Sequence, residues 1–361
     1  MTSEAPSEVP HVTSGTPLRL MGDDGGSPDP QRIRLDEDGQ LAVLRQMMLS
    51  RAVDQRAVSL QRQGRFGTLS TVTGQEASVT ASAMALERGR DWLVPQYREL
   101  PGMMYHGYPL EHFFLYFMGN MAGAGVPDEA RVLPIQIALA AQIPHAVGLA
   151  WGRQLQGHDE VVIVYFGDGA SSEGDFHEAC NLAGILGAPV IFFLQDNGWA
   201  ISTPRRMQSA AASFADRAPG YGIAGAVVDG NDALAVHAVT AEAVDRARAG
   251  DGPTLIESKT YRLGPHNTAD DPTRYVDDAE REEWEARDPI ARLQRHLAAS
   301  GAWDDDLAAE VERDNEAEIE RALGVAFETP SPTVDQIFDH VYAADSVRLA
   351  RQRASLSGGD R

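Results

Sequence analysis

Cysteine is almost absent from this sequence of 361 residues, since Cys180 is the only one. A single thiol excludes an internal disulfide and favours a reducing compartment. Lysine is equally rare, because Lys259 is the only one and arginine supplies the other positive side chains. The chain must therefore fold without covalent cross-links.

Positive charge as a whole is scarce. The chain has 31 lysine and arginine residues against 53 aspartate and glutamate residues, which gives a net charge of −22 and a pI near 4.8. This balance argues against nucleic acid or an anionic membrane as a partner. No apolar run approaches the roughly 20 residues of a membrane-spanning helix. Residues 1–15 lack the basic start and apolar stretch of a signal peptide. We therefore expect a cytoplasmic protein with no membrane partner.

Composition divides the chain into three predicted parts. Residues 1–38 are rich in proline, glycine, serine and aspartate, which predicts a flexible or extended N-terminal arm. Residues 39–288 alternate apolar runs with helical patterns and form the predicted α/β domain. Residues 289–361 are charged and predict a C-terminal helical segment with a polar tail. The hydrophobic fraction of 43% is enough for a buried core in the central part.

Hydrophobic periodicity predicts the elements of the central domain. The expected helices span residues 41–63, 75–86, 135–151 and 233–249. The expected strands span residues 92–95, 161–166, 189–194, 226–229 and 254–262. Alternation of strands and helices predicts an α/β fold with a doubly wound parallel sheet.

Two of the expected strands end in an oxygen-bearing side chain between or beside glycines. The 161–166 strand runs into a Gly-Asp-Gly turn centred on Asp168, and the 189–194 strand runs into an Asp-Asn-Gly turn centred on Asn197. A strand–helix–strand unit brings both strand ends to one edge of a parallel sheet, where open α/β sheets bind ligands. A carboxylate and an amide oxygen suit Mg²⁺, which takes few protein ligands and completes its shell with phosphate oxygens.

The turn around Asp168 also has features of an anion site. Glycines on both sides of Asp168 let a bulky anion approach the backbone. Ser171 or Ser172 with Asp175 predicts a helix N-cap, whose free N–H groups favour a diphosphate. On its own, a Gly-Asp-Gly sequence is equally consistent with a ligand site and with an ordinary tight turn. The second strand ending at Asn197 favours a metal–diphosphate site.

Residues 165–203 resemble the thiamine-diphosphate fingerprint. The longer sequence GDGASSEGDFHEACN, together with NGWAIS, resembles the alpha subunit of the decarboxylating component of 2-oxo acid dehydrogenase complexes. The similarity runs from about residue 45 to about residue 343. It implies an oxidoreductase that uses thiamine diphosphate and Mg²⁺, decarboxylates a 2-oxo acid and passes the acyl group to a lipoyl arm. Residues 39–288 would be its thiamine-diphosphate-binding domain.

The resemblance assigns residues to the diphosphate. Tyr97 and Arg98, in the text YRE, match the position that holds it, and an arginine fork suits a phosphate. Gly169 and Ala170 match backbone donors to the same group. Gln195 falls where some members place an arginine.

Further positions match the metal and the rest of the cofactor. The carbonyl of Trp199 would join Asp168 and Asn197 on the Mg²⁺ ion. Ile137 and Leu139 would line the aminopyrimidine pocket, although residues 133–144 otherwise read as an ordinary core helix.

His266 is the expected catalytic residue. It lies in a loop after the 254–262 strand, where a single histidine is more often structural. By resemblance it lies over the thiazolium region of the cofactor and helps to position the 2-oxo acid, a role that suits the pKa range of histidine. His145, His177 and His237 lie on expected helices and are predicted to be structural.

The sequence around His266 also indicates which 2-oxo acid is the substrate. HNTADDPTRY and VSLQRQGR resemble the branched-chain members, which predicts 2-oxoisovalerate as substrate and a role in branched-chain amino acid catabolism. Pyruvate and acetoin remain open alternatives. Asn267 stands where regulated relatives carry a serine, which excludes phosphorylation there.

The chain lacks anything that resembles a pyrimidine-binding domain. In the family, the glutamate that activates the cofactor belongs to a beta subunit. The resemblance therefore implies an α2β2 heterotetramer with its site at the α/β interface, and a lipoyl-bearing dihydrolipoyl acyltransferase as further partner.

One rival hypothesis is a non-catalytic structural subunit, supported by Asp196 and Gln195. Another is a nicotinamide dinucleotide enzyme, which the absence of G-x-G-x-x-G after a first strand disfavours.

Overall fold

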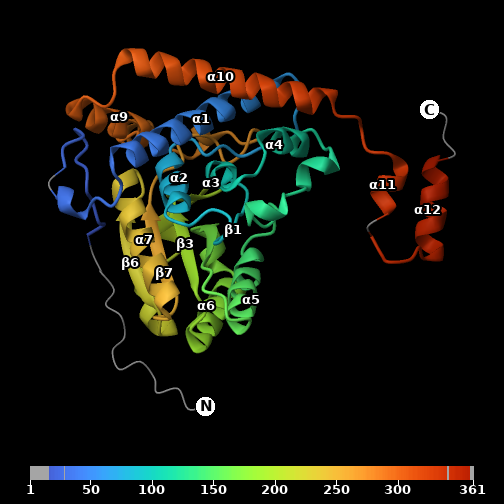
Figure 1. Cartoon of the computed structure of the whole chain (residues 1–361), viewed down its shortest axis with the longest axis horizontal. Coiled ribbons are helices and arrows are strands. Elements are labelled where there is room, and N and C mark those ends of the chain that lie inside the picture. Colours follow the sequence, from blue (N-terminus) through green and yellow to red (C-terminus); the bar gives the residue numbers. More distant parts are fainter. Residues whose placement is uncertain (1–15, 28, 340, 358–361) are drawn as a thin grey trace.

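A five-stranded parallel sheet forms the centre of the computed structural model, which describes residues 16–27, 29–339 and 341–357 (Figure 1). In spatial order its strands are β1 (Trp92–Val94), β2 (Val162–Gly167), β3 (Val190–Asp196), β7 (Thr254–Lys259) and β6 (Ala224–Asp229). All five strands expected from the sequence are confirmed, with shifts at their ends. β4 (Trp199–Ala200) and β5 (Thr203–Pro204) form a small antiparallel pair beyond β3.

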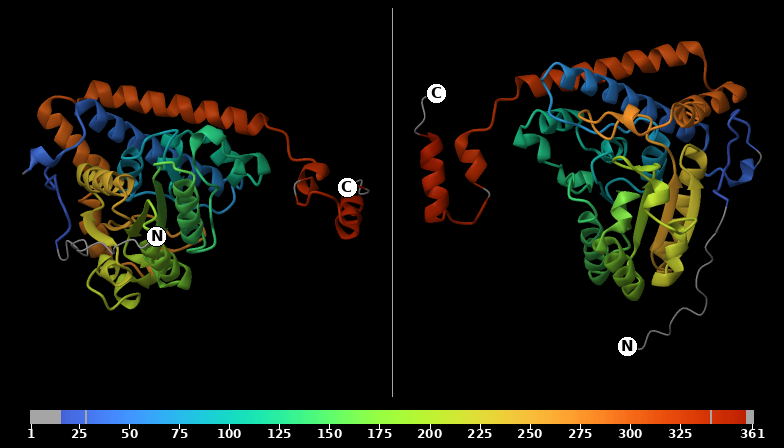
Figure 2. Two further views of the ribbon diagram at one scale, coloured as in Figure 1. Left: turned by 60° about the horizontal axis from the view of Figure 1, so that its bottom comes forward. Right: turned by 180° about the vertical axis from the view of Figure 1, so that it is seen from behind.

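Helices cover both faces of the sheet, which confirms the doubly wound prediction (Figure 2). One face packs Ile163, Tyr165 and Phe193 into a core shared with the buried residues of α1 (Glu37–Arg62), α2 (Glu76–Met84) and α7 (Ala233–Ala249). The other face packs alternate strand residues against α5 (Gln142–Leu155) and α6 (Gly174–Leu186). The strands are apolar throughout because both of their faces are buried.

The remaining elements extend this domain. Three of the expected helices are confirmed as α1, α2 and α7, and α1 begins earlier than expected because Asp36 caps it by accepting from Gly39 N at 2.9 Å. The other α-helices are α3 (Leu100–His106), α4 (Leu110–Phe117), α8 (Asp278–Glu285), α9 (Pro289–Ser300), α10 (Asp305–Glu328), α11 (Val334–Phe338) and α12 (Val347–Ser357). Helix α10 lies along α1, and α11 and α12 form a hairpin that stands away from the sheet (Figure 1).

Part of the expected flexible arm is fixed to the sheet. Leu18 pairs with β6 through Leu18 N to Val227 O at 2.9 Å and Asp229 N to Leu18 O at 3.0 Å. Leu20 and Met21 are fully buried in the core. Residues 18–21 of the arm are therefore held against the domain, because a few apolar residues in a polar stretch find a place in the core. Residues 1–15 of the expected arm lie outside the described residues.

The helix expected over residues 135–151 is wrong for residues 135–141. Helix α5 begins only at Gln142, and the preceding segment runs beside β1 and its continuation. Leu133 N donates to Leu93 O at 3.0 Å, and Gln136 N donates to Gln96 O at 2.9 Å. Tertiary hydrogen bonds thus override the apolar pattern that suggested a helix.

None of the helices in the described part of the chain is both long and apolar enough to cross a membrane.

Buried Arg292 ties three distant segments together. This side chain of α9 is fully buried and pairs with Asp229 at 2.9 Å and Asp232 at 3.6 Å. It also donates to Gly22 O at 3.0 Å and to Met21 O. One guanidinium therefore holds α9, the end of β6 and the N-terminal segment. Its removal would leave buried Asp232 without its counter-ion, while Asp229 would keep its pair with Arg19 at 2.9 Å.

We expect Arg292→Ala to lower the free energy of unfolding by roughly 3–5 kcal/mol, the usual cost of breaking a buried ion pair. Arg295→Ala is the matched control, because exposed Arg295 on the same helix donates only to Asp23 O, at 2.7 Å. Urea unfolding of both variants measures the difference. Equal losses in the two variants would contradict this role of Arg292.

Candidate active site

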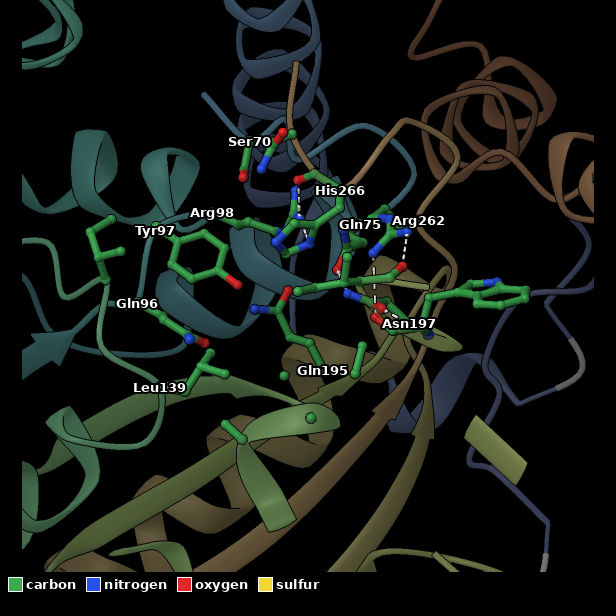
Figure 3. Close-up of a pocket in the computed structure, with 18 of the residues that line it drawn as sticks. Ser70, Gln75, Gln96, Tyr97, Arg98, Leu139, Gln195, Asn197, Arg262 and His266 are labelled. Atoms are coloured by element: carbon green, nitrogen blue, oxygen red, sulfur yellow. Dashed lines mark hydrogen bonds between the residues drawn. The ribbon is translucent and has the colours of Figure 1, made fainter. Parts of the chain in front are cut away.

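A cavity of about 470 Å³ opens at the edge of the sheet where β2 and β3 end, and we call it the edge cavity (Figure 3). The parallel register pairs Gly167 with Gln195, so the turns after the two strands lie side by side. The edge cavity is lined by every residue that the sequence assigned to a site: Tyr97, Arg98, Ile137, Leu139, Asp168, Gly169, Ala170, Gln195, Asn197, Trp199 and His266. The structure therefore brings the expected residues together, while their individual roles stay predictions.

Asp168 directly follows β2 and is only 2% exposed. Its Oδ1 accepts from Gly169 N at 3.0 Å, and its Oδ2 accepts from Gln208 Nε2 at 2.7 Å. Burial raises the pKa of this carboxyl, and the two hydrogen bonds oppose that shift. A cation in the cavity would stabilise the ionised form.

The helix cap predicted after Asp168 is wrong. A 3₁₀ turn (Gly169–Ser172), capped by Asp168, comes first, and α6 starts behind Glu173 without a side-chain cap. The Gly169 N–H expected to face a diphosphate is the one that donates to Asp168. A Cβ on Gly169 would lie 2.8 Å from the Cβ of Ala200, so this close approach requires glycine.

The Asn197 turn presents oxygen atoms to the cavity. Asn197 Oδ1 accepts from Trp199 N at 3.2 Å, and its Nδ2 donates to Gln75 Oε1 at 3.0 Å, which fixes the amide. The Trp199 carbonyl, an expected metal ligand, accepts from Arg262 Nη1 at 3.3 Å. Gly198 has a φ of 85°, which favours glycine in this turn.

The donor set suits Mg²⁺ held jointly with a phosphate ligand. It contains one carboxylate, one amide oxygen and one backbone carbonyl. Within the described ranges, no group of three or more histidine, cysteine, aspartate and glutamate side chains could hold a metal. A metal here therefore needs oxygen atoms from a bound ligand, as is usual for Mg²⁺ beside phosphates.

Arg98 is one of two buried arginines that line the cavity, at 6% exposure beside Arg262 at 3%. Its Nη1 donates to Thr71 O at 2.6 Å, and its Nη2 donates to His266 O at 2.6 Å. Burial lowers the pKa of Arg98, yet a guanidinium stays charged. Its remaining N–H groups can donate to an anion, which would compensate a charge that has no carboxylate bonded to it in the described structure.

His266 is neutral and has a defined tautomer. Burial, then the charges of Arg98 and Arg262, lower its pKa to about 4. Arg98 Nη2 lies 3.2 Å from His266 Nδ1, and a guanidinium can only donate, so Nδ1 must accept. The ring proton therefore sits on Nε2, which can donate to a ligand. The Tyr97 ring lies edge-on to the imidazole, with centroids 6.3 Å apart.

Gln195 and Glu99 brace the cavity wall. Glu99 Oε2 accepts from Gln96 N at 2.9 Å and Arg98 N at 3.0 Å, while Oε1 accepts from Gln195 Nε2 at 2.7 Å. Burial raises the pKa of Glu99. Gln195 thus links β3 to the turn that carries Arg98, and its contact with a cofactor stays a prediction.

Sequence reasoning missed several polar residues that hold the predicted site residues in place, among them Gln75, Glu99, Gln208 and Arg262. Two carried a usable signal, because Glu99 completes the YRE text and Arg262 ends the strand before the His266 loop. Gln208 carried none, since it reaches Asp168 only through the fold of the β4–β5 segment.

We expect the pKa of His266 in the ligand-free protein to be about 4 instead of 6.5. Because the folded value lies below the unfolded one, this site lowers stability as pH falls from 6.5 towards 4. NMR titration of the imidazole measures the pKa. Arg98→Gln should raise it by removing a nearby positive charge, and an ordinary pKa in the unmutated protein would contradict the burial described here.

Comparison with known proteins gives the family. Residues 44–335 match the family described as "Dehydrogenase E1 component". The chain is 43% identical over 337 residues to the protein named "Pyruvate dehydrogenase E1 component subunit alpha" of Staphylococcus epidermidis (strain ATCC 12228), covering 93% of this chain and 91% of the relative. It is 44% identical over 319 residues to the protein of that name from Staphylococcus aureus (strain Mu50), covering 88% and 86%.

These names support the pyruvate alternative better than the branched-chain interpretation of the sequence. Members of the family use thiamine diphosphate with a divalent metal. The chain belongs to the dehydrogenase E1 component family, as an alpha subunit of a thiamine-diphosphate-dependent 2-oxo acid dehydrogenase.

Proposed function

We propose that this chain is the alpha subunit of a pyruvate-decarboxylating E1 component. It binds the diphosphate and Mg²⁺ of thiamine diphosphate at an interface with a beta subunit in an α2β2 assembly. The acyl product passes to the lipoyl arm of a dihydrolipoyl acyltransferase. The observation that carries the proposal is that buried Asp168, Asn197 and Arg98 line one cavity. In the proposal, the first two are metal ligands and Arg98 is the donor to phosphate.

The proposal gives the predicted metal and diphosphate residues of the edge cavity one task each. Asp168, Asn197 and the Trp199 carbonyl hold the metal, and Arg98 with the Tyr97 hydroxyl holds the phosphates, assisted by the backbone of residues 169–170. Burial raises the pKa of Tyr97, so its hydroxyl stays protonated and can donate. When bound, thiamine diphosphate supplies the electron sink for decarboxylation.

The apolar side of the cavity fits the organic part of the cofactor and a second subunit. Ile137 and Leu139 line the cavity, yet they are 58% and 44% exposed. Both lie in the nonhelical segment 133–141 that precedes α5. We assign them to the aminopyrimidine ring and expect the beta subunit to cover them, which removes apolar surface from water.

His266 acts as a hydrogen-bond donor to the substrate in this proposal. Its neutral ring keeps the proton on Nε2, because Nδ1 accepts from Arg98. An Nε2–H group can stabilise negative charge that develops on the oxygen of the 2-oxo acid. Burial, and then the charges of Arg98 and Arg262, lower the pKa of His266, so the donor stays uncharged near neutral pH.

A branched 2-oxo acid remains the second candidate substrate. The loop text HNTADDPTRY, which resembles the branched-chain members, is its specific support. Leu69, Phe117 and Ile201 add apolar surface to the same cavity and suit a larger alkyl group.

Asp168→Ala should abolish metal-dependent binding of the cofactor, with an affinity loss of roughly 100-fold or more, since even residues behind a metal ligand change affinity 10–100-fold. Asp175→Ala is the control, because Asp175 is an exposed carboxylate on α6. Calorimetry with Mg²⁺ and thiamine diphosphate on the complex with its beta subunit decides. Undiminished affinity in Asp168→Ala would overturn the assignment of the metal site.

The chain alone should have no 2-oxo acid decarboxylase activity. The complex with its beta subunit should have a higher kcat/KM for pyruvate than for 2-oxoisovalerate. The chain alone is expected to be inactive because the exposed Ile137 and Leu139 leave one side of the pocket for a partner to cover. The preference for pyruvate is expected from the names of the relatives. Competition between the two substrates on one preparation of the complex gives the ratio of their kcat/KM values directly. Preference for 2-oxoisovalerate would favour the second candidate. A complex that binds the cofactor but turns over neither acid would support the structural-subunit hypothesis.

A further inference from the structure

Asp54 is a carboxylate in the middle of α1, where only 4% of the residue is exposed. A buried carboxylate is unfavourable unless several donors reach it. Three donors do so here: Val72 N at 2.7 Å, Thr73 N at 3.0 Å and Thr73 Oγ1 at 2.9 Å, all to Asp54 Oδ2. The side chain therefore anchors the loop between α1 and α2, which we call the 68–74 loop.

The next amide of this loop binds a second buried carboxylate. Gly74 N donates to Glu76 Oε2 at 2.9 Å, and Glu76 Oε1 pairs with Arg51, one helical turn before Asp54 on α1. Arg51 Nη2 also reaches Asp288 at 2.9 Å. The amides of three consecutive residues, 72 to 74, thus point to carboxylates on the same side of the loop.

This arrangement fixes where the carbonyl groups point. In a trans peptide the N–H and the C=O of one plane point in opposite directions. Val72 N–H faces Asp54, so the carbonyl of Thr71 faces away from α1, and it accepts from Arg98 Nη1 at 2.6 Å. The orientation of Asp54 is in this way transmitted to the guanidinium in the edge cavity.

The peptide between Thr73 and Gly74, two peptides later, is fixed in the same way. Gly74 N–H faces Glu76, and the carbonyl of Thr73 on the opposite side accepts from Leu263 N at 3.3 Å. Thr268 N also donates to Leu69 O at 3.0 Å. The 68–74 loop therefore holds both Arg98 and the loop that carries His266.

We infer that Asp54 is a positioning residue for cofactor binding, which acts through the Thr71 carbonyl on Arg98. The inference rests on the proposed function, because it takes Arg98 as the donor to the diphosphate. Asp54 itself does not line the edge cavity. It sets the direction of Arg98 before the ligand arrives, so that less ordering is needed on binding.

Asp54→Ala leaves the three donors without an acceptor and should weaken thiamine-diphosphate affinity roughly 10-fold or more. Asp54→Asn keeps one acceptor oxygen of similar shape and should recover most of that loss. Calorimetry on the complex with its beta subunit and Mg²⁺ measures both. Unchanged affinity in Asp54→Ala would overturn the inference.

Asp232→Ala is the matched control. Asp232 is also a fully buried carboxylate that accepts from backbone amides, Leu20 N at 2.6 Å and Met21 N at 2.7 Å, but it does not line the edge cavity. It should lower the melting temperature and leave cofactor affinity unchanged. If Asp232→Ala lost as much cofactor affinity as Asp54→Ala, general destabilisation would explain both losses. That result would overturn the positioning role of Asp54.

The route through Arg98 is tested by combining substitutions. In an Arg98→Gln background, Asp54→Ala should reduce affinity no further, because residues that act through one contact are not additive. Full additivity would overturn the route. If unmutated complex fails to bind the cofactor, the proposed function fails instead, which separates the two outcomes.

A measurement on the unmutated protein keeps the test independent of folding. The amides of residues 72–74 should exchange slowly with deuterium in the cofactor-free complex, since carboxylates already hold them. Fast exchange of this peptide, becoming slow only with cofactor, would show that the arrangement is not formed beforehand and would overturn the inference.

Discussion

The parallel pairing of β2 with β3 is the constraint on which the site depends. Its register places Gly167 beside Gln195, so that Asp168 and Asn197 leave adjacent strands at the same edge. Both strands are buried on both faces, and a slip by one residue would turn the buried side chains of each strand to the opposite face. The positions of the two predicted metal ligands are therefore as fixed as the hydrophobic core.

Around this edge, polar groups are buried in pairs that orient one another. Glu99 fixes Gln195, Gln75 fixes Asn197, and backbone carbonyls fix Arg98. Each such group is costly to bury alone, but inside the protein a satisfied hydrogen bond is electrostatically stronger than in water. Preorganised donors of this kind need little reorganisation when charge arrives, which suits binding of an anion and catalysis on it.

The cavity is nevertheless open on one side. Ile137 and Leu139 remain exposed on the irregular segment before α5, which ends in a turn instead of continuing the helix. Alpha subunits of this family pair with a beta subunit and with the acyltransferase core of the complex. An apolar wall facing solvent is consistent with such pairing, since burial of that surface favours association. In our proposal the second subunit completes the site.

The sequence alone determined what depends on neighbouring residues. Apolar runs that end in Asp168 and Asn197 identified two strands and their edge, and α7 was predicted with its observed ends. Residues 133–141 were misassigned because hydrogen bonds to a segment forty residues earlier, near Gln96, outweigh their helical pattern. Asp54 and Gln208 gave no signal, since the groups they bind are adjacent only in space. Local periodicity reports which face is buried; only the folded chain decides which buried polar groups meet.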